Sequence, residues 1–283
     1  MAYNIKISKF SSLNFSEWKN YFQTDTCYVQ KFAPGDTIRC QLSLTDDANV
    51  SIKFKDHRTG EVSDVNIVEL LVQDNLTTYY FEYTGLDFGR YEVFITNYWY
   101  EEKVASCVFD VMPPDMLQNT VLFRYENRED RYDTVFLNGD NHYSFDFRVE
   151  GGFLFSEIKS QVNNNTFRDQ SYRIYQLSAY PYQTKTLTLG TSRGVPWWVA
   201  EKVNLIFSLS DVLIGDDIYT RSEGSSPEVT EIDRNYPLYV IKMDVEPAEI
   251  FSEQKKKYPD TYFLVTEDRL SYITTEDSSR ITI

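Results

Sequence analysis

The stretch Thr37–Leu44 reads TIRCQLSL and alternates between apolar and polar side chains. Ile38, Cys40, Leu42 and Leu44 fall on one face, and the residues between them are polar. A period of two residues is typical of a β-strand with one buried face. The residues directly before this stretch are Pro-Gly-Asp, which is the chemistry of a turn. The stretch therefore predicts a half-buried strand that begins after a turn.

Several neighbouring segments show the same short, turn-bounded pattern. They are Val50–Phe54, Glu61–Val68, Thr78–Tyr83, Tyr91–Tyr98 and Val104–Val111. Turn signals recur roughly every 8–15 residues, a spacing that is typical of β-sandwiches. The chain up to Met112 therefore predicts a sandwich of about seven strands.

One local motif makes this expectation more specific. The segment Leu86–Val93 reads LDFGRYEV, with Asp87, Gly89 and Tyr91 at alternate positions. It resembles the tyrosine corner of immunoglobulin-like sandwiches, in which the tyrosine hydroxyl returns to the backbone upstream. Val93 stands where antibody domains keep a cysteine, so no disulfide between the sheets is expected.

The sequence Met112-Pro113-Pro114-Asp115 predicts a domain boundary, because two prolines force an extended connection. Beyond it, strand patterns surround one amphipathic helix that begins at Pro196 and ends near Leu209. The predicted fold is therefore mainly β, with an immunoglobulin-like sandwich followed by an α+β domain that has an antiparallel sheet and one helix. The predicted parts are an N-terminal arm (1–22), the sandwich (23–112), the α+β domain (113–247) and a C-terminal extension with a hairpin (248–283).

Composition narrows the classes of function. The chain has 283 residues, with 28 Lys and Arg against 43 Asp and Glu, so its formal net charge is −15. A chain this acidic repels phosphate, which argues against sequence-specific nucleic-acid binding and against anionic membranes. No apolar run reaches the ~18 residues of a membrane span, and the first residues lack a signal-peptide core. Three cysteines, an odd and sparse set, indicate reduced thiols and folding in a cytoplasm.

Residues for catalysis or metal binding do not stand out. The two histidines, His57 and His142, both lie in or beside predicted turns, without cysteines at ligand spacing. The sequence has no P-loop and no G-x-G-x-x-G motif. Asp216 and Asp217 are most simply the charged tip of a hairpin. We therefore expect no cofactor, no metal and no enzymatic activity.

Two aromatic clusters remain, Tyr98-Trp99-Tyr100 at the end of a strand and Trp197-Trp198 at the start of the helix. Three interpretations are open: core packing, burial at a subunit interface, or a platform for sugars. Charged residues follow both clusters, Glu101-Glu102-Lys103 and Glu201-Lys202, as in the rim of an interface. If the clusters are not part of the core, these charged residues favour a subunit interface over a platform for sugars.

The second half of the chain also resembles a known group. Three stretches carry this resemblance: FRDQSYRIYQLSAYPYQTKTLTLG from Phe167, GVPWWVAEKVNLIFSLSDVLIGDDIYTRSEGSSPEVTEI from Gly194, and YPLYVIKMDVEP from Tyr236. Two shorter stretches resemble the same group, VEGGF from Val149 and CYVQKFAPGDTIRCQL from Cys27. These stretches resemble virion structural proteins of tailed phages and prophages of Bacteroidetes, including crAss-like phages. The resemblance implies a neck, tail or portal-proximal ring assembled in the host cytoplasm.

The leading hypothesis is thus a non-enzymatic virion structural protein that forms a homo-oligomeric ring and contacts other neck, tail or portal proteins. The helix Pro196–Leu209 is the predicted contact between subunits, with Trp197 or Trp198 as anchor and Ile206 and Phe207 beside it. The alternatives are a glycan-binding adhesion module in a tail tip or baseplate, and a hydrolase of the cell envelope.

Overall fold

The structure is a computed structural model that describes residues 5–17, 28–45, 50–73, 76–98, 102–131, 133–191, 193–233 and 236–248. Residues 1–248 form one compact unit. The described residues are mainly β, with antiparallel sheets and a single α-helix, so the predicted fold class is confirmed. The helix and hairpin predicted for the C-terminal extension lie outside the described residues.

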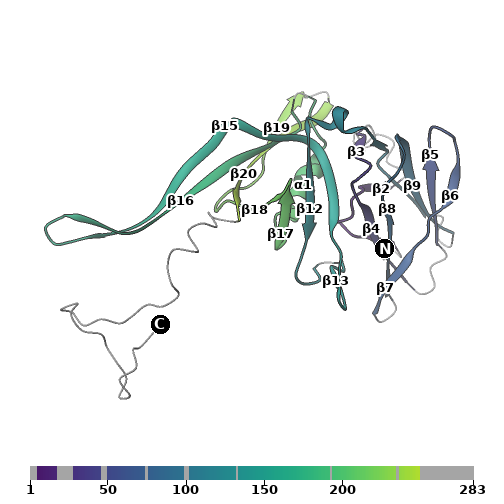
Figure 1. Cartoon of the computed structure of the whole chain (residues 1–283). Coiled ribbons are helices and arrows are strands. Elements are labelled where there is room, and N and C mark those ends of the chain that lie inside the picture. The colour runs from purple at the N-terminus through teal and green to yellow at the C-terminus, as the bar shows by residue number, and fades with distance from the viewer. Residues whose placement is uncertain are drawn as a thin grey trace, which may run out of the picture. The chain divides into compact units, whose positions relative to one another are not determined.

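The first part of the chain forms two sheets (Figure 1). One sheet has the order β1-β4-β8-β7, from β1 (Ile5–Ile7), β4 (Ile38–Thr45), β7 (Val68–Gln73) and β8 (Leu76–Tyr83). The other has the order β2-β10-β9-β11-β3, and β5 and β6 extend it on the free side of β9. Its strands are β2 (Phe15–Glu17), β3 (Gln30–Phe32), β5 (Val50–Asp56), β6 (Val62–Asp64), β9 (Gly89–Asn97), β10 (Glu102–Ser106) and β11 (Phe109–Val111).

The two sheets enclose one apolar core, so this part of the chain is a sandwich. Strand β4 supplies the apolar face expected from its alternation, with Ile38 and Cys40 buried. Its opposite, polar face is also covered, because the side-chain amide of Gln41 forms hydrogen bonds with both backbone groups of Val135, 2.7 Å and 3.0 Å long. The alternation therefore located the strand, but burial on both faces depends on a distant segment.

The tyrosine corner is present as a local structure. The hydroxyl of Tyr91 donates a hydrogen bond of 2.9 Å to the carbonyl of Asp87. A Cβ at Gly89 would lie 3.0 Å from that hydroxyl oxygen, which explains why a glycine occupies the position between them. The predicted return of the hydroxyl to the upstream backbone is confirmed.

The described N-terminal residues differ from the predicted arm over 1–22. Strand β1 pairs with β4, and β2 pairs with β10, so residues 5–17 contribute a strand to each sheet. Phe10 and Leu13 between them are buried. Large apolar side chains favour burial, and strand edges offer unpaired backbone groups, so this segment folds into the sandwich rather than remaining an arm.

After a short 3₁₀ helix, η2 (Pro114–Leu117), the chain forms a third sheet, which is closed. Neighbouring strands pair in the order β15-β12-β17-β18-β20-β16, and β16 pairs back with β15, so six antiparallel strands close into a barrel. They are β12 (Thr120–Glu126), β15 (Phe145–Arg168), β16 (Ile174–Leu189), β17 (Asp211–Ile214), β18 (Asp217–Arg221) and β20 (Tyr236–Pro247). Strand β19 (Glu228–Asp233) pairs with β20 outside the ring, and β13 (Leu137–Asn138) and β14 (Asn141–His142) form a separate small hairpin.

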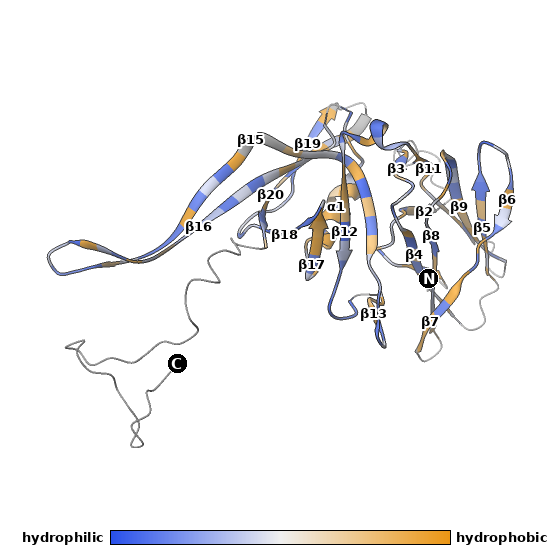
Figure 2. Ribbon diagram, viewed as in Figure 1, coloured by the Kyte–Doolittle hydropathy of each residue, from blue (hydrophilic) through white to orange (hydrophobic). Residues whose placement is uncertain are grey.

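The helix α1 (Trp197–Ile206) packs on the core of this barrel. Figure 2 shows its hydrophobic colouring among the strands. Val199, Val203 and Ile206 are fully buried, at the spacing expected of one helix face. Pro196 is the N-cap residue rather than the first helical residue, so the helix begins one residue later than the sequence predicted.

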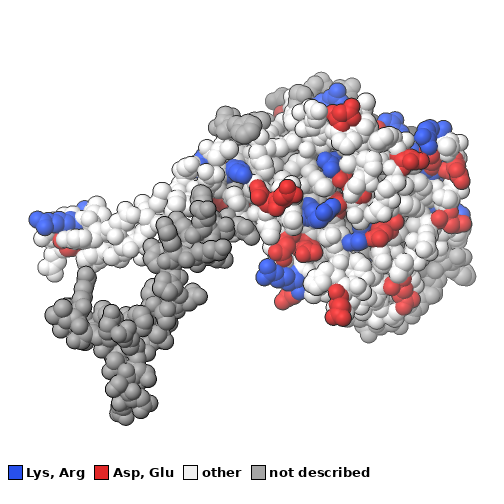
Figure 3. Space-filling model, in the orientation of Figure 1, with Lys and Arg blue, Asp and Glu red and all other residues white. Residues whose placement is uncertain are grey.

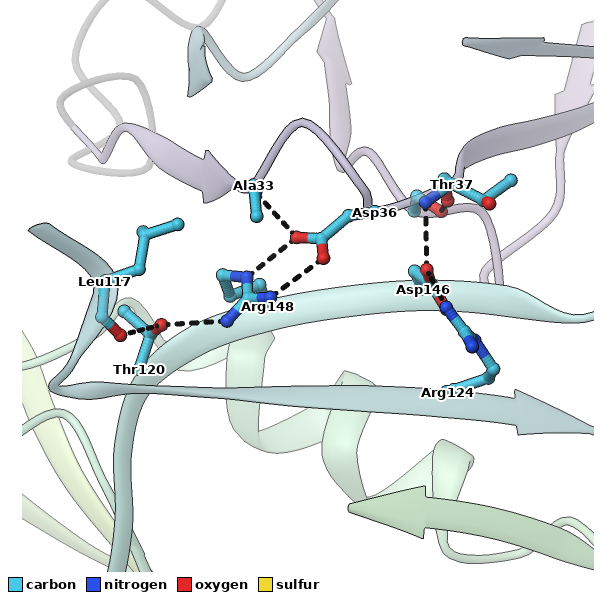
Figure 4. A network of polar contacts seen from close by, with 9 residues as sticks. Ala33, Asp36, Thr37, Leu117, Thr120, Arg124, Asp146 and Arg148 are labelled. Carbon is cyan, nitrogen blue, oxygen red and sulfur yellow. Dashed lines mark hydrogen bonds and ion pairs between the residues drawn. The ribbon is translucent and has the colours of Figure 1, made fainter. Parts of the chain in front are cut away.

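Buried charges join the sandwich to the barrel (Figure 4). The carboxylate of Asp36, between β3 and β4, accepts two hydrogen bonds from the guanidinium of Arg148 on β15, of 2.7 Å and 2.8 Å. Asp36 also accepts the backbone N–H of Ala33 at 2.7 Å. A charged pair this well satisfied fixes geometry, because any rotation between the partners would leave a buried charge unpaired.

A second ion pair with the same arrangement lies two residues away along β15. Asp146 on β15 accepts two hydrogen bonds from Arg124 on β12, of 2.8 Å and 3.0 Å, and one of 2.9 Å from the backbone N–H of Thr37. The hydroxyl of Tyr125 donates to the carbonyl of Phe10 at 2.6 Å. The sandwich and the barrel are thus held together by directional contacts, and the barrel has a fixed platform from which other elements can extend.

Candidate functional site

Strands β15 and β16 continue far beyond the barrel as a two-stranded hairpin (Figure 1). Their outer parts are Ile158–Arg168 and Ile174–Gln183, and we call this pair of segments the distal ribbon. Within it, β16 is the only strand of the described part of the chain that pairs with β15. Isolated two-stranded hairpins are marginally stable in water, so a ribbon of this length needs further packing or further strands.

The distal ribbon is anchored at its base by contacts to β18 and β20. Lys159 forms an ion pair of 3.1 Å with Asp244, whose carboxylate also accepts the hydroxyl of Thr186. These partners lower the pKa of Asp244, chiefly through the Thr186 hydrogen bond. The ring of Phe153 packs on that of Tyr219 at 5.1 Å between centroids. The ribbon therefore leaves the barrel from a defined position.

Gly151 and Gly152 allow the chain to bend where β15 leaves its pairing with β12, before the distal ribbon. Gly151 has a φ of 140°, and a Cβ there would lie 2.3 Å from the carbonyl oxygen of Thr188. Any side chain at this position would therefore clash with the backbone of β16. The pairing register also shifts between Phe153 and Ile158, an irregularity that is common where a sheet changes direction.

The distal ribbon is exposed and carries almost no charge. Every residue from Ile158 to Arg168 is exposed, which means that both faces of the strand meet solvent. The eight residues Ser160–Phe167 and the ten residues Ile174–Gln183 include no Asp, Glu, Lys or Arg, although such residues make up 25% of the chain. Figure 3 shows this surface as mostly white between the body and the tip, where the next charges lie.

The register places four aromatic rings on one side of the distal ribbon. Directly opposed residues share a face, and Tyr182 opposes Gln161, Tyr180 opposes Asn163, and Tyr175 opposes Phe167. We call the side formed by Phe167, Tyr175, Tyr180 and Tyr182 the aromatic face. Tyr180 is 60% exposed and Tyr175 is 49% exposed. Aromatic residues without nearby charge are the composition of an interface core, whereas a solvated surface is usually rich in charge.

The two edges of the distal ribbon differ. Edge strands are normally protected from pairing by charges, prolines or bulges. Strand β16 has Pro181, which cannot donate a backbone hydrogen bond, and an extra residue, Leu177, at a register shift. On β15, the run from Ser160 to Phe167 has neither a proline nor a charge. The edge of β15 is therefore the open one.

The helix residues predicted as an oligomer contact do not form one surface. Trp198, Ile206 and Phe207 are buried in the core of the barrel, with Trp198 only 9% exposed. Trp197 is 50% exposed, and its ring contacts that of Tyr239 at 5.6 Å. The open alternative of core packing therefore holds for three of the four residues, because the interior of the barrel must be filled.

The first aromatic cluster is described only at its first residue. Tyr98 is 59% exposed after β9, and Trp99 and Tyr100 lie outside the described residues. His57 forms a hydrogen bond of 2.9 Å with Glu92, and His142 lies on β14. Among the described residues, no three metal-binding side chains gather, and no helix has the length and hydropathy of a membrane span.

One buried ionisable group lies where the N-terminal segment meets α1. The amine of Lys202 donates to the carbonyl of Ser11 and lies 5.0 Å from the centre of the Phe147 ring. Burial lowers the pKa of Lys202 to about 8, and the nearby Cys40 and Cys107 oppose that shift. A lysine in this position holds the N-terminal segment against the helix.

No protein-family model and no curated protein sequence matches this chain. The distal ribbon is the feature that sequence reasoning missed. Strands with both faces exposed lack the alternation that marks half-buried strands. The available signal was the long absence of charge around residues 160–183 in an otherwise highly charged sequence, interrupted only at the tip.

Proposed function

We propose that this chain is a non-enzymatic structural protein of a tailed phage virion, assembled as a homo-oligomeric ring in the neck or tail region. The observation that carries the proposal is the distal ribbon, an exposed hairpin with almost no charge in a chain of net charge −15. Exposed aromatic side chains and an unprotected strand edge are features of assembly surfaces.

Further support comes from the construction of the body and from the resemblance of the sequence. The strand order β1-β4-β8-β7 against β5-β9-β11, together with the tyrosine corner, favours an immunoglobulin-like sandwich. The stretches beginning at Phe167, Gly194 and Tyr236 resemble virion proteins of Bacteroidetes phages. A rigid body with a protruding ribbon suits a ring whose subunits contact their neighbours and other neck, tail or portal proteins. We assign no cofactor, no nucleic-acid sequence recognition and no membrane association.

The test is the oligomeric state of the purified full chain. Light scattering coupled to size-exclusion chromatography, followed by negative-stain electron microscopy, should reveal closed rings of many copies. Rings are expected because a heterologous contact between identical chains closes when its rotation divides a full turn. A chain that stays monomeric over a wide range of concentrations and salt would contradict the proposal.

A glycan-binding adhesion module is the second candidate, and the exposure of Tyr98 favours it. Aromatic rings on an open surface stack on sugars. A glycan array probed with the wild type and with a Tyr98→Ala variant tests this candidate. Binding that disappears in the variant would support adhesion, and an array without signal would reject it.

A further inference from the structure

We propose that the distal ribbon binds a second copy of this chain, through its aromatic face and the open edge of β15. This inference rests on the proposed ring function and names the surface that holds neighbouring subunits together. Helix α1, the contact expected from the sequence, has most of its apolar side chains in the barrel core.

Exposed aromatic rings favour a partner that covers them. Tyr175, Tyr180 and Phe167 are large, exposed and on the same side of the ribbon, where the described residues of this chain do not cover them. The hydroxyl of Tyr182 donates to the side-chain carbonyl of Gln161 across the ribbon at 2.5 Å, so that ring is held in place. Rigid aromatic side chains lose little conformational entropy when a partner covers them.

The low charge of the distal ribbon favours a second copy over a different partner. Each copy carries a formal charge of −15, so copies repel one another wherever acidic surfaces meet. A basic partner would be matched by acidic residues and an acidic partner by basic ones, but the distal ribbon has neither between Ser160 and Phe167. An uncharged ribbon meets no charge repulsion from a neighbouring copy, so it can take part in the heterologous contact that a ring of identical chains requires.

The open backbone edge of β15 also favours pairing with a neighbouring chain. Beyond the barrel, no strand of the described residues pairs with the outer side of β15. A neighbouring strand at this edge would satisfy those backbone groups and convert a marginal two-stranded hairpin into a larger sheet. Asn163, Asn164 and Asn165 lie along this strand, and side-chain amides at such a position can form hydrogen bonds between neighbouring strands. Because Pro181 interrupts the donors of β16, pairing is expected at the β15 edge.

The experiment compares two double variants of the full chain. Tyr175→Ser/Tyr180→Ser removes two rings of the aromatic face. Tyr98→Ser/Tyr172→Ser is the control, because it removes two tyrosines that are also more than half exposed, just after β9 and at the tip turn, and that are not on that face. Circular dichroism and urea unfolding should show that both variants fold like the wild type.

We expect the aromatic-face variant to weaken assembly by about 30-fold or more, and the control to change it little. Hydrogen exchange should also slow in residues 158–168 when the wild type passes from dilute monomer to assembly, because new edge hydrogen bonds protect amides. Rings that form equally well from both variants, with fast exchange in 158–168, would overturn this inference and leave the proposed function standing. A wild type without any ring would reject both.

Discussion

The clearest test of the architecture is the buried pair between Asp36 and Arg148. Replacement of Arg148 by Ala removes two of the three hydrogen bonds that Asp36 accepts, of 2.7 Å and 2.8 Å, and leaves only the N–H of Ala33. The Asp36 side chain is 4% exposed and that of Arg148 is 14% exposed, so water cannot replace the lost partner easily. Removal of one member of a buried pair costs about 3–5 kcal/mol.

Arg90 and Asp110 provide a matched control with the same chemistry. This pair also has two hydrogen bonds, of 2.7 Å and 2.9 Å, but the Arg90 side chain is 55% exposed. Exposed pairs contribute about 0.2–1 kcal/mol, so Arg90→Ala should have little effect. The comparison therefore isolates burial as the cause of the difference.

The assay is equilibrium unfolding in urea, monitored by tryptophan fluorescence and far-ultraviolet circular dichroism. With a slope of about 3 kcal/mol per molar urea, Arg148→Ala should lower the midpoint by about 1 M or more. Arg90→Ala should shift it by less than about 0.3 M. Equal shifts for the two variants would refute the argument that this pair joins the sandwich to the barrel.

Two further predictions concern the helix. Trp198→Ala should lower the free energy of unfolding by about 3–5 kcal/mol, because it opens a cavity in the barrel core. Trp197 is half-exposed, so Trp197→Ala should lower it by less than about 1 kcal/mol. Urea unfolding measures both values, and equal losses would be inconsistent with the burial of Trp198. For Lys202, the folded pKa of about 8 lies below the ordinary 10.5, so between these pH values the unfolded chain binds more protons and stability rises with pH. The free energy of unfolding of the wild type, minus that of Lys202→Met, should therefore rise by on the order of 3 kcal/mol from pH 8 to pH 10.5. A flat difference across this range would show that the amine is hydrated in the folded protein.

Features that depend on residues close together in the sequence were predicted correctly, whereas features that depend on distant contacts were not. The alternation of Thr37–Leu44, the tyrosine corner at Tyr91 and the helix after Pro196 were all recognised, because each depends on residues a few positions apart. Trp198 was predicted as a possible anchor between subunits, but it lies in the barrel core. An aromatic residue on a helix has the same sequence pattern whether it faces a core or a partner.

The distal ribbon was not predicted, although its two strands are close together in the sequence. Its pairing is local, since Phe167 opposes Tyr175, but its exposure on both faces is not visible from residue type alone. Sequence patterns detect strands by the contrast between a buried and a solvated face, and this ribbon offers no such contrast. Only the absence of charge distinguished it in the sequence.

From the sequence alone, one can obtain the mainly β class, most strand positions and the turns between them, because turn chemistry and periodicity act over a few residues. Only the tertiary structure decided that six strands close into a barrel, that the N-terminal segment joins the sandwich, and that Asp36 meets Arg148 across 112 positions of the chain. These features depend on which distant surfaces come together, and the energy of such contacts is set by burial and geometry that no short stretch of sequence encodes.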